Sequence, residues 1–169
     1  MTVSKKAIAG IVGGIVIATV IAYFSLSHTD TSDSVSIIFQ GHVTDVIDGD
    51  TIEVEHIRIR LSLTSTPELN EKGGVEAKEF TANLCPLGSS ARVVVDGGQL
   101  EDQFGRTVAK VYCDEILLNS ELLERGLASI DKRFCSTSEF ASEDWAKRYG
   151  CTQTVQTKEN KQTSSMDFR

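Results

Sequence analysis

Three strand-like stretches follow one another closely in the first half of the chain, and they limit the possible fold more than any other feature. They cover residues 37–47, 51–55 and 57–63, and each combines β-branched residues with alternating apolar and polar positions. In the third stretch the odd-numbered positions are apolar and are expected to face a core, whereas Arg60 lies on the opposite face. The sequence therefore predicts three consecutive strands joined by tight turns.

Two further strands and three helices complete the expected set. The patterns predict strands at 91–96 and 107–113 and helices at 75–84, 119–125 and 138–149. Asn119 and Ser138 are the expected N-caps of the last two helices. Five short strands with a helix after the third match the order of an OB-type barrel. The expected fold class is thus mainly β with α: a five-stranded Greek-key OB barrel with about three helices.

Residues 7–26 contain no charged residue and are rich in Ile, Val, Ala and Gly. A helix of about 20 such residues spans a bilayer, so one N-terminal transmembrane helix is expected to precede the barrel. Lys5 and Lys6 come just before it, and the positive-inside rule then leaves residues 1–6 in the cytoplasm. We expect a signal anchor in the cell membrane, single-pass, with the domain on the extracellular side. A cleaved signal peptide is the alternative, but its apolar region is usually only about 7–15 residues long.

The rest of the chain divides into a linker, one domain and a tail. Residues 27–36 are dominated by Ser, Thr and Asp and are expected to form a linker. Residues 37–151 are enough for a single domain with its own core. Residues 152–169 are polar, and we expect them to form a disordered tail.

All four cysteines lie in the part of the chain predicted to be outside the cytoplasm: Cys85, Cys113, Cys135 and Cys151. An even number of cysteines in that compartment favours two disulfides, although the sequence allows three pairings. We favour Cys135 with Cys151, which bracket the last predicted helix, and by elimination Cys85 with Cys113. A zinc site is a weaker alternative, because there is no C-x-x-C pair and the histidines are distant in sequence.

Three short motifs contain the candidate chemistry. They are V-I-D-G-D-T at 46–51, R-L-S-L-T-S-T-P-E at 60–68 and D-Q-F-G-R at 102–106. In this order they resemble the staphylococcal nuclease family, also called thermonucleases, over roughly residues 41–130. The resemblance implies an OB-type barrel that hydrolyses phosphodiester bonds of DNA or RNA with a calcium ion and little sequence preference.

The resemblance also implies a role for individual residues. It assigns metal binding to Asp50, to the Thr66 carbonyl and, close by, to Asp48; the general base to Glu68; and the phosphate clamp to Arg60 and Arg106. Oxygen ligands suit calcium, and the planar fork of arginine suits a phosphate. Each residue alone also has a purely structural interpretation, such as a turn or a local ion pair. Their occurrence together, in the right order and spacing, favours the site.

Some positions depart from the family pattern. Ser65 stands where the family has a second metal-binding aspartate, and a neutral hydroxyl predicts weaker calcium binding, in the range of about 10⁻⁴–10⁻³ M. Phe104 is the expected stacking residue for substrate. Lys132 replaces a tyrosine near the nucleotide pocket of the family and is expected to bind a phosphate. Glu71 is a further, weaker candidate for a water-mediated contact.

The charge balance opposes tight non-specific binding of nucleic acid. The chain has 24 acidic and 17 basic residues, a net charge of −7, whereas nucleic-acid binders are usually basic. The leading hypothesis is still a membrane-anchored extracellular nuclease that prefers single-stranded DNA or RNA and has no protein partner. The alternatives are a catalytically weak or inactive OB-type module that binds nucleic acid or another ligand, which Ser65 favours, and a surface domain whose acidic face contacts a protein.

Overall fold

The computed structural model describes residues 37–151. The predicted cytoplasmic head (1–6), membrane helix (7–26), linker (27–36) and tail (152–169) lie outside the described residues. Among the helices of the described domain, none has the length and apolar character needed to cross a membrane.

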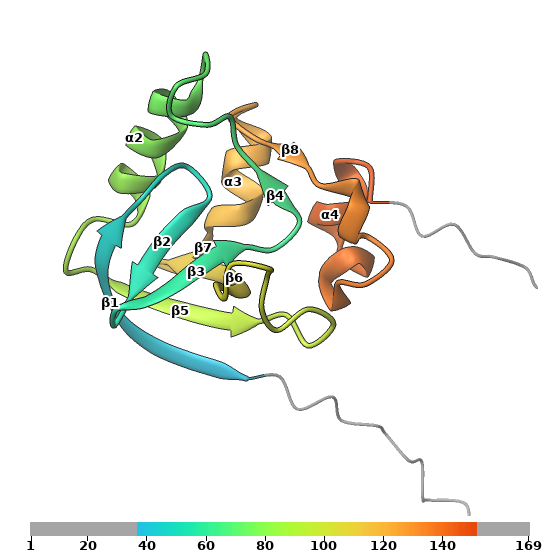
Figure 1. Ribbon diagram of the computed structural model, residues 1–169, viewed down its shortest axis with the longest axis horizontal. Coiled ribbons are helices and arrows are strands. Elements are labelled where there is room, and N and C mark those ends of the chain that lie inside the picture. The colour runs from blue at the N-terminus through green and yellow to red at the C-terminus, as the bar shows by residue number, and fades with distance from the viewer. Residues whose placement is uncertain (1–36, 152–169) are drawn as a thin grey trace, which may run out of the picture. The chain divides into compact units, whose positions relative to one another are not determined.

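Five strands form a closed barrel (Figure 1). They are β1 (Ile38–Val46), β2 (Thr51–Val54), β3 (Ile57–Leu61), β5 (Ser90–Val95) and β6 (Thr107–Cys113). The sheet order is β3-β2-β1-β5-β6, and an additional parallel pairing of β3 with β6 closes it. The predicted fold class, mainly β with a closed five-stranded barrel and helices, is confirmed.

Shorter elements cover the barrel. They are β4 (Thr64–Ser65), β7 (Ile116–Leu117), β8 (Ser129–Ile130), α2 (Gly74–Leu84), α3 (Leu118–Glu124), the 3-10 helices η1 (Lys132–Phe134) and η2 (Glu139–Ser142), and α4 (Asp144–Arg148). Strand β4 pairs with β8, and β7 extends the sheet beside β6. Helix α3 packs against both β6 and α2.

The apolar face of the strands fills the barrel as predicted, except at the two ends of the third predicted strand. Leu63 lies beyond the end of β3 and packs in a second apolar cluster with Trp145. Ile59 and Leu61 of β3 are buried, together with Ile52, Val93 and Val111 from neighbouring strands. Ile57, expected to face the core, is instead 43% exposed. It is the first residue of β3, directly after the tight β2–β3 turn, and so lies at the rim of the barrel.

Two predictions about helices are wrong. The helix predicted at 138–149 is split, because Glu143 has an extended backbone (φ −73°, ψ 152°) between η2 and α4. Ser138 does cap the first piece, where its side chain accepts a hydrogen bond from the Phe140 amide. Asn119 is not an N-cap: it lies inside α3, fully buried, and its amide bonds to the backbone of Val111 and Ser62.

Both favoured disulfides are present. Cys85–Cys113 ties the end of α2 to the end of β6, and Cys135–Cys151 brackets η2 and α4. The second bridge fixes the C-terminal segment close to the residues that precede Cys135.

Candidate active site

The turn that connects β1 to β2 presents two carboxylates. The backbone amide of Asp50 donates a hydrogen bond of 3.0 Å to Asp48 Oδ1, a local bond that favours aspartate in turns. A Cβ atom on Gly49 would lie 2.6 Å from Ala77 Cβ, so only glycine fits between the turn and α2. From the same helix, Thr81 Oγ1 donates a hydrogen bond of 2.7 Å to the Gly49 carbonyl. Helix α2 therefore holds the turn in place.

The Asp50 carboxylate is buried and well supplied with partners. Its Oδ2 accepts hydrogen bonds from the Thr66 amide (2.6 Å) and the Thr66 hydroxyl (3.1 Å). Its Oδ1 lies 3.0 Å from Arg60 Nη1. Burial raises the pKa of Asp50, and the charge of Arg60 and the hydrogen bond from Thr66 offset that rise only in part. Three of the predicted site residues are thus in direct contact.

Backbone carbonyls also orient Arg60, which comes from β3. Its Nη1 donates to the carbonyls of Leu61 (3.2 Å) and Thr64 (2.6 Å). Between those two carbonyls, Leu63 has a left-handed φ of 59°, which turns the chain toward the guanidinium. Only 18% of the Arg60 side chain is exposed, so its position is well defined.

Arg106 comes from the loop before β6, where Asp102 orients it. Asp102 Oδ2 accepts from Arg106 Nε (2.7 Å) and forms an ion pair of 2.6 Å with Nη2. The third nitrogen, Nη1, donates to Thr51 Oγ1 at 3.1 Å, and Thr51 directly follows Asp50. Burial opposes ionisation of Asp102, but the hydrogen bonds from Arg106 outweigh it and lower the pKa of this carboxyl.

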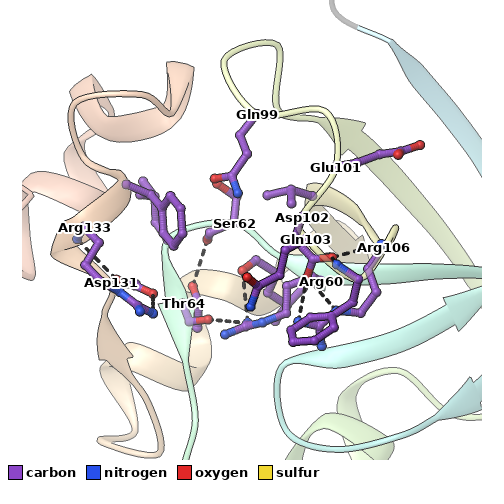
Figure 2. A pocket seen from close by; sticks show the side chains of 15 residues that line it. Arg60, Ser62, Thr64, Gln99, Glu101, Asp102, Gln103, Arg106, Asp131 and Arg133 are labelled. Carbon is purple, nitrogen blue, oxygen red and sulfur yellow. Dashed lines mark hydrogen bonds and ion pairs between the residues drawn. The ribbon is translucent and has the colours of Figure 1, made fainter.

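The two predicted clamp arginines line one cavity of about 360 Å³ (Figure 2). Parallel pairing of β3 with β6 places Arg60 beside Val108, two residues after Arg106. Phe104, also predicted as a site residue, lines the same cavity and is 73% exposed. The cavity therefore combines two guanidiniums with an aromatic face, groups that suit a phosphate and a base.

A third arginine, Arg133, lines this cavity, although no motif in the sequence indicated it. Arg133 Nε and Nη2 bind the two carboxylate oxygens of Asp131 at 2.9 and 2.7 Å. These hydrogen bonds lower the pKa of Asp131. Phe134 also lines the cavity, beside Arg133. The run Asp-Lys-Arg-Phe at 131–134 marks this segment of the sequence as basic and aromatic, but it does not tell which side chain enters the cavity.

Lys132, predicted to bind a phosphate here, is not a wall residue of the cavity. Its side chain is directed toward Gly150, where a Cβ atom would lie 3.3 Å from Lys132 Cε. Residues 132–134 form a 3-10 helix with about three residues per turn, so successive side chains point in different directions. Arg133 and Phe134 take the place that was expected for Lys132.

Glu68 and Ser65 lie outside the cavity as well. Glu68 is exposed in the loop after β4, where its amide donates to Glu71 Oε2 at 3.1 Å. Ser65 and Glu71 line a separate open depression, together with Thr66 and Ser129. Thr66 connects this depression to the Asp50 carboxylate, which does not line the cavity itself but pairs with Arg60 in its wall.

The oxygen donors near Asp50 match calcium in type, but they are few. Calcium takes about six to eight oxygen ligands. Within residues 37–151, no group of three or more His, Cys, Asp or Glu side chains is placed to hold a metal ion. By the family resemblance Asp48 and Asp50 would supply carboxylates and Thr66 a carbonyl, while position 65 offers only a neutral hydroxyl. In the structure the Asp50 oxygens already bind Arg60 and Thr66, so an ion would have to replace part of these contacts. Such a set fits a weak site in which water completes the coordination.

Comparison with known proteins gives consistent matches. The family model described as staphylococcal nuclease homologue matches residues 58–162. An uncharacterized protein of Bacillus anthracis is 35% identical over 101 residues, which cover 54% of this chain and 47% of that protein. A probable staphylococcal-like nuclease of Oryza sativa subsp. japonica is 34% identical over 80 residues, which cover 47% of this chain and 23% of that protein. The chain thus spans less than half the length of these curated relatives.

Proposed function

Because the chain belongs to the staphylococcal nuclease family, we propose that it is a nuclease that hydrolyses phosphodiester bonds of DNA or RNA. The observation that carries this proposal is the convergence of Arg60 and Arg106 on one cavity, next to the buried carboxylate of Asp50. Two guanidiniums at one cavity suit a phosphate, and the carboxylate beside them suits a hard cation.

Arg60 and Arg106 bind the phosphoryl oxygens. Extra negative charge develops on these oxygens when water attacks phosphorus, and donors already in place stabilise it without reorganisation. Arg60 is fixed by two backbone carbonyls, and Arg106 is fixed by Asp102 and Thr51. The clamp is therefore preorganised before substrate enters.

Asp50 and the Thr66 carbonyl are the residues that would hold calcium, with Asp48 close by. The ion would supply positive charge next to the phosphate. Ser65 removes one carboxylate from this set, which makes the proposed site weak and dependent on the calcium supply.

Glu68 is the proposed general base. A base must come within about 2.6–3.2 Å of the water it deprotonates, or act through one further water. What supports Glu68 is its position two residues after Thr66, whose amide bonds to Asp50. Glu68 lies in the segment between β4 and α2, where its side chain is exposed to solvent and is not packed in the barrel core.

We also propose that the enzyme acts outside the cell, anchored to the membrane through residues 7–26, and prefers single strands. Two disulfides are typical of oxidising compartments. The exposed ring of Phe104 offers a stacking surface, which only an unpaired base can use.

A direct test incubates the full chain, with both disulfides formed, with single-stranded DNA in millimolar calcium. We expect fragments to accumulate, to stop accumulating when a chelator is added, and to form more slowly from duplex DNA. Absence of fragments over long incubation would contradict the proposed nuclease activity. Cleavage that continues in chelator would contradict only the proposed requirement for calcium.

The second candidate is a binding module without catalysis, and the serine at position 65 favours it. Such a module would bind an oligonucleotide equally well with and without calcium and would release no product. The same incubation, followed by a binding measurement, separates the two.

A further inference from the structure

Two aspartate–arginine pairs of the same construction lie on opposite sides of the cavity (Figure 2). Asp102 holds Arg106 through Nε and Nη2, and Asp131 holds Arg133 through the same two nitrogens. In both pairs the aspartate also accepts a hydrogen bond from the backbone amide of its arginine. Arg60 lies between the pairs in this view.

We propose that Arg133 forms a second phosphate subsite, which binds the phosphate next to the one that Arg60 and Arg106 hold. The substrate class is then a strand that presents at least two consecutive phosphates, rather than an isolated phosphate ester. This inference rests on the proposed nuclease function, because it takes the phosphate between Arg60 and Arg106 as its reference point.

The Arg133 guanidinium is available for such a contact. Among the hydrogen bonds of the described domain, Nε and Nη2 of Arg133 serve Asp131 and none uses Nη1. Its side chain is 80% exposed, against 22% for Arg106, whose Nη1 serves Thr51. Arg106 is thus held in a fixed position, while Arg133 presents its Nη1 to a ligand that enters the cavity.

The scaffold under Arg133 is firm although the side chain is exposed. The Asp131 amide donates a hydrogen bond of 2.8 Å to the Leu63 carbonyl, next to the carbonyl that holds Arg60. Strand β8 ends at the residue before Asp131, and Cys135 of the second disulfide follows η1. The backbone that carries Arg133 is therefore fixed relative to the turn that holds Arg60 by a hydrogen bond, the β4–β8 pairing and a disulfide.

The cavity between the pairs suits one nucleotide unit. Its volume of about 360 Å³ is near the lower end of the range of roughly 300–1,000 Å³ that is usual for ligand pockets. Phe104 lines it beside Arg106, and Phe134 lines it beside Arg133. One base and sugar that fill this space would leave their flanking phosphates near the two arginine pairs.

The test measures binding to the full chain in chelator, so that the strand stays intact. The probes are an oligothymidylate of about eight nucleotides and thymidine 5′-monophosphate, each titrated over a range of salt. Arg133→Ala should bind the oligomer roughly tenfold more weakly, lower the slope of log Kd against log salt by about 0.7, and lose less affinity for the monophosphate. Asp131→Asn keeps the backbone contact but removes the competing charge, so it should bind the oligomer more tightly.

Arg148→Ala is the matched control, since Arg148 is an exposed arginine of the same C-terminal segment that does not line the cavity. It should change both affinities by less than about twofold. The subsite would be contradicted if Arg133→Ala left the oligomer affinity and its salt dependence unchanged, or if it lowered the affinities for both probes equally. This binding measurement does not depend on catalysis. If the wild type binds the oligomer with the predicted salt dependence but forms no product, the proposed nuclease activity is contradicted and the phosphate subsite is still supported.

Discussion

Arg60 Nη1 lies 3.0 Å from Asp50 Oδ1, and both side chains are largely buried, with 18% and 8% of their surface exposed. This ion pair joins the proposed phosphate clamp to the proposed metal site. A phosphate that binds Arg60 and a cation that binds Asp50 would each replace part of the same pair. We therefore expect substrate and calcium to bind in a coupled manner.

Ionisation of Asp50 should lower the free energy of unfolding as the pH rises. Its pKa is raised by burial, so the folded chain holds this proton more tightly than the unfolded chain does. The stabilising contribution is fully present below about pH 4 and is lost as the pH rises through the folded-state pKa. Asn cannot ionise, so Asp50→Asn should not lose stability in this pH range. The unfolding free energy of the variant relative to that of the wild type should therefore increase above about pH 4, while cleavage activity disappears.

Asp102 provides the control with the opposite sign. Its pKa is lowered in the folded chain, so its contribution to stability is present above about pH 4 and lost as the pH falls further. Urea denaturation of Asp50→Asn, Asp102→Asn and the wild type between pH 3 and 8 would separate the two. The same pH dependence in both variants would contradict the assignment.

Arg106→Ala should reduce the cleavage rate by about 10²–10³-fold, because it removes a donor aimed at the developing charge. The matched control is Arg92→Ala: Arg92 is also ion-paired, lies over an aromatic ring, and has 29% of its side chain exposed, but it is outside the cavity. Melting curves should show both variants folded. Equal rates for Arg106→Ala and the wild type would contradict the site.

Ser65→Asp should restore the missing carboxylate, and the calcium concentration for half-maximal activity should fall roughly tenfold. Ser142→Asp adds the same charge at an exposed position that lines neither the cavity nor the depression around Ser65, and it should leave the calcium dependence nearly unchanged. Calcium titrations of cleavage rate test this directly. A similar shift in both variants would indicate a general charge effect.

Gly49→Ala should destabilise the fold by about 1–3 kcal/mol, because its Cβ would meet Ala77 Cβ at 2.6 Å. Adding Ala77→Gly should recover part of the activity lost by the single variant, since the turn can then return to its place. Denaturation and cleavage assays on the single and double variants provide the measurement. The same Cβ would also lie 2.8 Å from Thr66 Cγ2 and Oγ1, so only partial recovery is expected. No recovery in the double variant would mean that the contact with Thr66, and not the one with Ala77, decides the cost.

Removing Cys135–Cys151 by a double serine substitution should cost about 3 kcal/mol in the chain-entropy estimate for its 16-residue separation. The binding of single strands should weaken as well, because Arg133 and Phe134 directly precede Cys135. The Cys85–Cys113 bridge, with a separation of 28, should cost slightly more when removed. Guanidinium denaturation of the two double variants tests the order.

The sequence predicted the barrel well, because each strand carries its own alternation of apolar and polar residues. It failed where a distant partner decides the local structure. Glu143 interrupts the predicted last helix, and its carboxylate binds Lys110 Nζ of β6 (2.6 Å) as well as the nearby Trp145 Nε1 (2.7 Å). Asn119 was expected to cap a helix, but the barrel backbone takes its amide instead.

The contacts that join Asp50 to Arg60 and Thr66 link two of the sequence motifs, whereas no motif indicated the wall of the cavity formed by Arg133 and Phe134. Asp50, Arg60 and Arg106 lie in short motifs whose order carried the information. Arg133 and Lys132 are adjacent basic residues, and only the turn of η1 decides which one reaches the cavity. No pattern of charge or periodicity distinguishes them beforehand.

The parallel contact between β3 and β6 brings together residues that are far apart along the chain, with Arg60 opposite Val108. Because β6 begins directly after Arg106, this pairing places the two clamp guanidiniums at one cavity. A fragment that ends before Thr107 would contain both Arg60 and Arg106 but would lack β6, the strand whose pairing with β3 holds the two arginines at one cavity. Recovery of cleavage during refolding should therefore lag behind the first appearance of β structure and report completion of the native state.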